Sequence, residues 1–330
     1  MVCAQLLAFV FALAVFAVTA TACEGGGGEG AELTSLSTKL TGGGKEGETI
    51  TVSEGTKVKD KATLTGKNAS KATGKVTYKI YSDKECKTLV KSAGEVTVSG
   101  ESVPASSEEE LEGGKAYYWQ AHYGGDSKNA ESTSPCTEIL DVQATTSLST
   151  RLSGESKEGA ELTVLEGAKV KDKATVEGTN SSTAEGKVLY KIYSDNKCEA
   201  LVGEAGEKSV SSGAAAASNE EELAGGKSYY WRATYKGDSL HQESTSPCTE
   251  ILNVKAKTTL TTSLSGEGKE LEELTVLEGV GVKDKATLSG TNSATAGGKL
   301  LYKLFSDNKC ESPVKEAGEV TVSSGSVPAS

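Results

Sequence analysis

Short segments in which apolar and polar side chains alternate recur along the chain from residue 34 onward. The clearest is Gly74–Tyr81, where Val76, Tyr78 and Ile80 share one face and lysine and threonine side chains occupy the other. A period of two is the pattern of a half-buried β-strand. Because no stretch sustains helical spacing, the pattern predicts an all-β protein. The expected strands of the first unit span residues 34–40, 49–53, 62–64, 74–81, 95–98, 116–123 and 140–142.

The strand expected at Ala116–Tyr123 indicates which of its faces is buried. A second copy of this segment occurs at Ser228–Tyr235 and keeps the residues of one parity, while those of the other parity change. Packing constrains an inward face more than a solvated one. We therefore predict that the constant set points into the core rather than serving as a sugar-stacking surface. That set is Tyr117, Trp119, Ala121 and Tyr123.

The alternating segments belong to a repeat of 112 residues. Val58–Thr63 returns almost unchanged at Val170–Thr175 and again at Val282–Thr287. A fixed period of this length predicts a tandem array of one small domain, each unit long enough to bury its own core. The expected boundaries are 34–145 for domain 1, 146–257 for domain 2 and 258–330 for an incomplete domain 3 that lacks the last strands.

Two leucine-containing junctions link the predicted domains without glycine or proline. Leu140–Leu148 runs from the last strand of one domain into the first strand of the next, and Val254–Leu260 does the same. Such nearly continuous strands leave little room for a hinge. The sequence therefore predicts a semi-stiff rod.

The N-terminal segment has the features of an export signal. Leu6–Val18 is an uninterrupted apolar run, too short to span a membrane comfortably, and small residues follow it up to Cys23. Residues 1–22 are therefore expected to be a signal peptide, and 23–33 a flexible tether rich in glycine and glutamate. Cys23 is a candidate for lipidation, which would make the membrane a partner; simple cleavage is the alternative. Either outcome predicts a secreted or cell-surface protein.

Cysteine positions follow the repeat. Cys86 and Cys136 occur in the first unit, and Cys198 and Cys248 are their counterparts in the second. Two cysteines per unit in an exported chain predict the disulfides 86–136 and 198–248, with buried free thiols as the alternative. Cys310 corresponds to the first cysteine of each pair and is expected to be unpaired. Two cysteines this far apart, with no nearby histidine, do not suggest a zinc site.

The net charge and the candidate residues argue against several functions and point to no specific chemistry. The net charge of −11 argues against a nucleic-acid-binding function, because the sequence shows no basic patch that would neutralise phosphates. His122 and His241 are not equivalent positions, so they are expected to be surface residues. Asp126 and Asp238 lack the carboxylate ladder of a calcium site and are expected to cap turns. No catalytic, cofactor-binding or metal-binding residue is predicted. Asp60, Asp172 and Asp284 fall on the apolar parity of their strands, which the pattern does not explain.

Several blocks of the second unit resemble bacterial immunoglobulin-like repeat domains of exported proteins. They are Tyr193–Asp195 leading to Cys198, Tyr229–Asp238, and Glu243–Cys248. The resemblance implies tandem immunoglobulin-like β-sandwiches in surface or secreted proteins, often as stalks or adhesive modules, and it transfers no catalytic residue. Gly113-Gly114 before Tyr117 also resembles a tyrosine corner.

The expected function is therefore a non-enzymatic cell-surface spacer or adhesin-like stalk without a cofactor. Two alternatives remain open at this point. The units are ligand-binding modules for a carbohydrate or a host protein, or they form the anchor of a larger protein whose functional domain follows residue 330.

Overall fold

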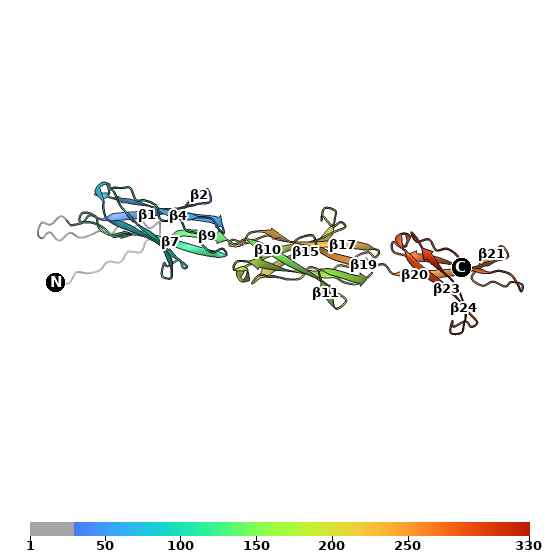
Figure 1. Cartoon of the computed structure of the whole chain (residues 1–330). Coiled ribbons are helices and arrows are strands. Elements are labelled where there is room, and N and C mark those ends of the chain that lie inside the picture. Colours follow the sequence, from blue (N-terminus) through green and yellow to red (C-terminus); the bar gives the residue numbers. More distant parts are fainter. Residues whose placement is uncertain (1–29) are drawn as a thin grey trace, which may run out of the picture.

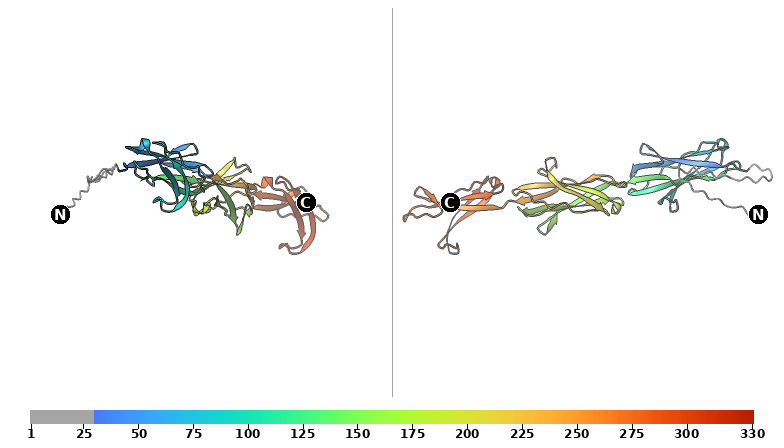
Figure 2. Two further views of the ribbon diagram at one scale, coloured as in Figure 1. Left: turned by 60° about the vertical axis from the view of Figure 1, so that its left-hand side comes forward. Right: turned by 180° about the vertical axis from the view of Figure 1, so that it is seen from behind.

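The computed structural model describes residues 30–330, in which three β-sheet units lie end to end along one axis (Figures 1 and 2). The predicted signal peptide, the lipidation candidate Cys23 and most of the predicted tether lie outside the described residues. Within the described part of the chain, no helix is long and apolar enough to cross a membrane. The helical content described there consists of three short 3-10 turns. They are η1 (Ala69–Lys71), η2 (Ser181–Thr183) and η3 (Ser293–Thr295).

The first unit is a sandwich of two sheets. A three-stranded sheet has the order β2-β1-β4, and a six-stranded sheet has the order β3-β9-β7-β5-β6, with β8 paired to β7. All pairings are antiparallel except that of β3 with β9, which is parallel. The strands are β1 (Thr34–Gly42), β2 (Lys45–Gly47), β3 (Thr49–Ser53), β4 (Val58–Gly66), β5 (Lys75–Tyr81), β6 (Leu89–Thr97), β7 (Lys115–Tyr123), β8 (Ser132–Thr133) and β9 (Glu138–Gln143).

Alternating side chains from both sheets fill the space between them. The parity predicted for β5 and β7 is confirmed: Val76, Tyr78, Trp119 and Tyr123 are all completely buried. Tyr78 also joins the two sheets, because its hydroxyl accepts a hydrogen bond from the Ala62 N–H on β4. Complete burial of these large aromatic side chains removes much apolar area from water, so these strands contribute strongly to the stability of the unit.

The second unit repeats this arrangement, with one added connection. The two-residue strand β16 pairs with both β13 and β15, so the faces of the sandwich join into one ten-stranded sheet. The strands are β10 (Thr146–Gly154), β11 (Lys157–Gly159), β12 (Glu161–Leu165), β13 (Lys171–Gly178), β14 (Gly186–Tyr193), β15 (Leu201–Ser211), β16 (Ala214–Ala215), β17 (Lys227–Tyr235), β18 (Ser244–Thr245) and β19 (Glu250–Lys255).

The third unit has counterparts of the early strands and a more exposed interior. Leu304 is 48% exposed, whereas its counterparts Ile80 and Ile192 are 0% and 2% exposed. Among the described residues, no strand of this unit corresponds to β7 or β9, which cover that face in the first unit. The strands are β20 (Thr258–Gly266), β21 (Lys269–Leu271), β22 (Lys283–Gly290), β23 (Gly298–Phe305) and β24 (Pro313–Val322).

The fold class predicted from alternation is therefore confirmed: the described chain is all-β, in tandem two-sheet sandwiches. The expected strands match the observed ones closely; the segment 49–53, for instance, is β3. The pattern missed β2 and the parallel pairing of β3 with β9, because a three-residue strand carries too little periodicity to be recognised.

Candidate functional site

Each of the two complete units contains one disulfide, and the two disulfides are at equivalent positions. Cys86 is bonded to Cys136 with a Cα–Cα distance of 6.0 Å, and Cys198 to Cys248 with 5.9 Å. These are the pairs that the repeat predicts. In the first unit the disulfide links the turn after β5 to the segment before β9, and in the second unit it links the turn after β14 to the segment before β19. Cys310 is a free, exposed cysteine.

The turn that carries each first cysteine is organised by one aspartate. In the second unit, the Asp195 carboxylate accepts hydrogen bonds from the backbone N–H groups of Lys197 and Ala200, at 2.9 and 2.6 Å. These N–H donors, first among them that of Ala200, lower the pKa of Asp195. The side chain thus caps a turn.

Tyrosine corners are present in both complete units. The Tyr117 hydroxyl donates a hydrogen bond of 3.1 Å to the carbonyl of Glu112, and the Tyr229 hydroxyl donates one of the same length to Ala224. The bond fixes the chain where it enters the strand, directly beside the glycine pair that precedes it. The position of this hydrogen bond agrees with the resemblance to a tyrosine corner noted in the sequence.

Asp126 organises the base of the first unit, the end from which residues 30–33 enter. Its carboxylate accepts backbone N–H groups from Thr73 at 2.7 Å and from Lys128 and Asn129 at 2.8 Å. The Tyr123 hydroxyl donates a further bond of 3.1 Å. These donors, with the Thr73 N–H first, hold the pKa of Asp126 far below its usual range. Its acceptor positions are used within the protein, so the residue caps a turn, as predicted.

Asp238 has the same role in the second unit, but its neighbour differs. His241 takes the place of Asn129, is only 1% exposed, and has Nδ1 3.0 Å from both Asp238 carboxylate oxygens. The prediction of a surface histidine is therefore wrong for His241. Burial alone would raise the pKa of Asp238, but the N–H groups of Glu185 and Leu240, together with His241, outweigh it and lower the value.

The first unit ends against the segment that carries His241. The last residue before the second unit, Ala144, donates its N–H to the Leu240 carbonyl at 2.8 Å and accepts the Gln242 N–H at 3.0 Å. The Asn180 side chain donates a 2.7 Å hydrogen bond to the carbonyl of Gly113 in the first unit. The first junction is thus a set of direct hydrogen bonds between consecutive units.

The second junction repeats the same contact 112 residues later. The Asn292 Nδ2 donates to the Gly225 carbonyl, as Asn180 does to Gly113. The carboxylate of Glu166 accepts the Gly225 N–H at 3.2 Å and the Lys257 N–H at 3.2 Å, which fixes the chain as it leaves the second unit. The asparagine contact with the preceding unit is therefore common to both junctions.

The glycine pairs at the tyrosine corners allow this close approach. A Cβ added to Gly114 would lie 2.8 Å from the Asn180 Cβ, and one on Gly226 would lie 2.9 Å from the Asn292 Cβ. Both glycines also have positive φ, +76° and +75°, where a side chain is strained. The requirement for glycine here therefore comes both from the turn and from the neighbouring unit.

A pair of carboxyl groups lies in the core of each complete unit. Asp60 is 0% and Glu138 1% exposed, and in the second unit Asp172 is 0% and Glu250 2% exposed. Burial raises the pKa of Asp60 to about 7; burial, and next the charge of Asp60, raises that of Glu138 to about 9. In the sequence, only the aspartate stood out, because it occupies an apolar position of its strand. Nothing in the sequence pattern marked the glutamate at the start of β9 as buried.

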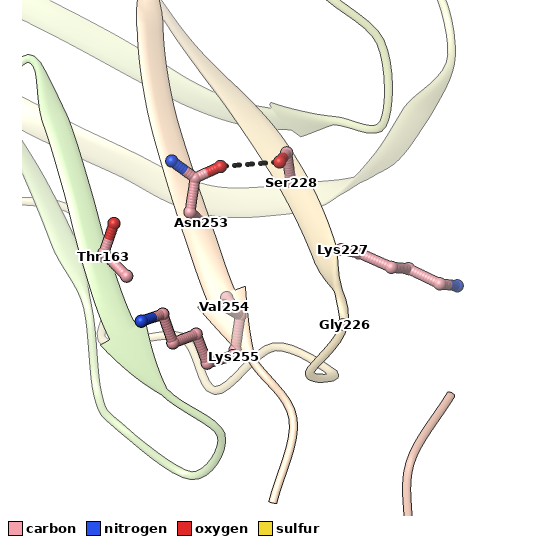
Figure 3. Close-up of a pocket in the computed structure, with 7 residues that line it drawn as sticks. All are labelled: Thr163, Gly226, Lys227, Ser228, Asn253, Val254 and Lys255. Atoms are coloured by element: carbon pink, nitrogen blue, oxygen red, sulfur yellow. Dashed lines mark hydrogen bonds between the residues drawn. The ribbon is translucent and has the colours of Figure 1, made fainter. Parts of the chain in front are cut away.

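An open groove of about 490 Å³ lies on the second unit, beside the second junction (Figure 3). The Ser228 hydroxyl donates a 2.6 Å hydrogen bond to Asn253 Oδ1 across two of its strands. No carboxylate, thiol or imidazole is among its lining residues. They are Thr163, Gly226, Lys227, Ser228, Asn253, Val254 and Lys255. Within residues 30–330, no group of three histidine, cysteine or acidic side chains has metal-binding geometry.

Comparison with known proteins gives structural similarity alone. No protein-family description matches the chain, and no curated protein is similar to it. Among solved structures, the fibronectin(III)-like modules of Clostridium thermocellum CbhA match with 14% identity and a TM-score of 0.25, covering 66% of this chain and 94% of theirs. A marsupial T cell receptor matches with 11% identity and a TM-score of 0.25, covering 82% and 86%. Salmonella alpha-2-macroglobulin matches with 10% identity and a TM-score of 0.21, covering 86% and 21%.

Proposed function

We propose that this protein is a non-enzymatic, cell-surface spacer that projects whatever it carries away from the envelope. The observation that carries the proposal is the repeated junction, in which Asn180 and Asn292 bind the preceding unit at equivalent carbonyls. A chain that served only to string independent modules together would not need the same close contact at each step. Repeated contacts of this kind favour a stalk whose length grows with the number of units.

Other features fit an extracellular stalk. The two disulfides indicate an extracytoplasmic location. Each bridge closes a loop of 50 residues, which in the chain-entropy model stabilises a unit by about 4 kcal/mol. Anchoring through a lipidated Cys23 belongs to this proposal, and a Cys23→Ser variant should then be released from the membrane fraction.

Deletion of one unit tests the spacer function. Removing residues 146–257 joins Thr145 to Thr258 and preserves the junction, because Asn292 then meets Gly113 in place of Asn180. With an epitope placed after residue 330, we expect its distance from the cell surface, measured by energy transfer to a membrane dye, to shrink by the length of one unit. An unchanged distance would contradict the spacer function, and an Asn68→Ala variant serves as a full-length control.

A ligand-binding array is the second candidate, and one observation favours it. The strand after each disulfide turn exposes a pair of apolar side chains at its start: Leu89 and Val90 are 54% and 42% exposed, and Leu201 and Val202 are 54% and 47% exposed. Replacing Leu201 and Val202 by serine should then abolish binding on a glycan array or to host cells. Leu165→Ser, at a residue 52% exposed elsewhere on the same unit, is the matched control.

A further inference from the structure

His241 contacts three segments that meet at the first junction. Its Nδ1 lies 3.0 Å from both carboxylate oxygens of Asp238, on the turn after β17. Its Nε2 lies 3.2 Å from the carbonyl oxygen of Asn180, and a Cβ added to Gly114 of the first unit would lie 3.2 Å from the same nitrogen. The imidazole ring therefore lies where the second unit meets the first.

Both ring nitrogens of His241 face groups that only accept hydrogen bonds. A carbonyl oxygen has no hydrogen to donate. Burial would raise the pKa of Asp238, but backbone N–H donors, together with His241, outweigh it and lower the value, so this carboxyl group is ionised. A neutral imidazole carries a hydrogen on one nitrogen only, whereas the imidazolium carries one on each. The observed contacts are therefore those of the charged ring.

The charges around the ring also favour the imidazolium. Burial opposes a charge on this side chain, which is 1% exposed, and the Asp238 carboxylate at 3.0 Å offsets that cost. The Tyr235 hydroxyl donates to the same carboxylate at 3.1 Å. Carboxylates outnumber ammonium groups among the charged side chains of the surrounding segments. They are Asp238, Glu243, Glu185 and Lys236 in the second unit, and Glu112 with its ion-pair partner Lys115 in the first.

The Asn180 loop connects this histidine to the first unit. The Asn180 side chain donates its 2.7 Å hydrogen bond to the Gly113 carbonyl. The Asn180 carbonyl holds the η2 turn, because it accepts the Thr183 N–H at 2.9 Å. A donor that binds the Asn180 backbone therefore steadies the side chain that crosses the junction.

We propose that His241 is a proton-dependent lock on the first junction. In its charged form the ring donates to Asp238 and Asn180 at once, and it holds the Asn180 loop against the first unit. When the ring gives up a proton to solvent, one of these two bonds is lost. The carboxylate is the stronger acceptor and keeps its hydrogen, so the bond to the Asn180 carbonyl breaks. The first junction is therefore stiff with the charged ring and looser with the neutral ring.

The pH dependence of the junction follows from the form of the ring that makes more contacts. The bond to Asn180 needs the protonated ring. It is present on the acidic side of the range in which histidine changes charge, about pH 5 to 8, and is lost as the pH rises through that range. The Asp238 carboxylate sets the lower limit, because it protonates only below the ordinary aspartate pKa of about 4. The junction should be stiffest between these limits.

The base of the first unit has an amide in place of this histidine. Asn129 occupies the position of His241, and its Nδ2 lies 3.0 Å from both carboxylate oxygens of Asp126. An amide neither gains nor loses a proton between about pH 5 and 8. The Asn68 loop is therefore a counterpart of the Asn180 loop without the proton switch, in the same molecule. A spacer with a pH-independent junction would still be a spacer, so this test and the unit deletion fail separately.

Amide hydrogen exchange of the full chain at about pH 6 and about pH 8 tests the lock. The Thr183 amide reports on the Asn180 loop. The Lys71 amide, bonded to the Asn68 carbonyl at 2.9 Å, reports on the control loop. After correction for the intrinsic pH dependence of exchange, we expect the protection of Thr183 relative to Lys71 to fall about two- to threefold at the higher pH, the lower end of the range for one hydrogen bond. An unchanged ratio would overturn the proposal.

Nitrogen NMR of the imidazole ring detects the proton itself. We expect His241 to carry a hydrogen on both nitrogens at about pH 6 and on Nδ1 alone at about pH 8. A ring that is neutral across this range would overturn the proposal. A ring that loses its Nδ1 hydrogen and keeps that on Nε2 would also overturn it, because the bond to Asn180 would then persist.

Two variants assign the pH response to His241. His241→Asn should give the same low protection ratio at both pH values, and His122→Gln should keep the parent's response, since His122 is the only other histidine. Two core carboxyl groups titrate in the same range: burial raises the pKa of Asp172 to about 6, and burial, then the charge of Asp172, raises that of Glu250 to about 8. Parent and variants share them, so only the difference belongs to His241. A pH response that persists in His241→Asn would overturn the proposal.

Discussion

The base of the first unit and the base of the second are built from equivalent segments of the repeat and have different neighbours. Of the described residues, 30–33 precede the first unit, where the backbone N–H of Glu32 donates to the Lys128 carbonyl. The whole first unit precedes the second, where the Ala144 N–H makes the equivalent bond to the Leu240 carbonyl. Asn68 has a φ of −111°, whereas its counterpart Asn180 has a φ of +53°.

The difference teaches that the preceding unit selects the backbone conformation of this loop. Asn292, at the second junction, also has a φ of +53° and makes the same bond to the preceding unit as Asn180. Asparagine is one of the few residues that enters this left-handed region readily, so all three copies can adopt either form. A neighbouring unit accompanies the strained form at both junctions, and the ordinary form occurs where that neighbour is missing.

A larger side chain at Gly114 should have the largest effect on the contact between the first and second units. Gly114→Val adds a branched side chain at a φ of +76° and against Asn180, so strain of about 1–2 kcal/mol adds to a steric overlap. We expect the first and second units to tumble independently in ¹⁵N relaxation measurements. Gly44→Val, at a glycine with a φ of +75° and nothing nearby, has the strain without the overlap. Equal tumbling in both variants would contradict the role of the glycine.

Low pH should destabilise the first and second units through Asp126 and Asp238, which organise their bases. The pKa values of Asp126 and Asp238 are lowered in the folded state, so their stabilising contribution is complete above the ordinary aspartate pKa of about 4 and is lost as the pH falls below it. Unfolding followed by Trp119 and Trp231 fluorescence should show both units losing stability between about pH 5 and 3.

An Asp126→Asn variant makes this test more specific. It should weaken the pH dependence of unfolding reported by Trp119 fluorescence and leave that reported by Trp231 unchanged. An identical pH response in the variant and the parent would show that Asp126 does not stabilise the base of the first unit.

Truncating the junction asparagine should have a smaller effect. Asn180→Ala removes one hydrogen bond across the junction, worth about 1 kcal/mol. Amide hydrogen exchange at the junction should therefore accelerate about fivefold. Asn68→Ala should leave the exchange at both junctions unchanged, because Asn68 does not contact a preceding unit. Acceleration by Asn68→Ala would show that the loop acts within its own unit.

Replacing His241, the neighbour of Asp238, by the asparagine found at the equivalent position of the first unit should have the smallest effect. His241→Asn gives the second unit the donor that Asn129 supplies to Asp126 in the first, so the bonds to Asp238 should persist. The contact of Nε2 with the Asn180 carbonyl, 3.2 Å in the parent, is lost. We expect a modest rise in exchange at residues 180–183, without a change in Trp231 unfolding. A large loss of stability would indicate that the histidine supports the core.

Much of the fold could be predicted because alternation and repetition report on burial directly. Trp119 and Tyr78 lie where their parity placed them, and the disulfide partners follow from the repeat. The short strand β2 could not be predicted from three residues of periodicity. His241 was mispredicted because its burial depends on its contacts with Asp238 and with the Asn180 loop, which the local pattern does not contain.

The site was predicted less well for a similar reason. Asp60 was noticeable as a polar residue on an apolar face, but its partner Glu138 begins a strand about eighty residues later. Only the packing of the two sheets brings these residues together. The junction bond from Asn180 to Gly113 likewise depends on how two units meet.

Small-angle X-ray scattering of the full chain tests the central claim, that successive units form one extended rod. Strands of nine residues give each unit a length of about 30–40 Å, so three units in line should give a maximum dimension of about 90–120 Å and a rod-like profile. A compact particle with a radius of gyration of about 20 Å, the value for a globular chain of this length, would contradict the account.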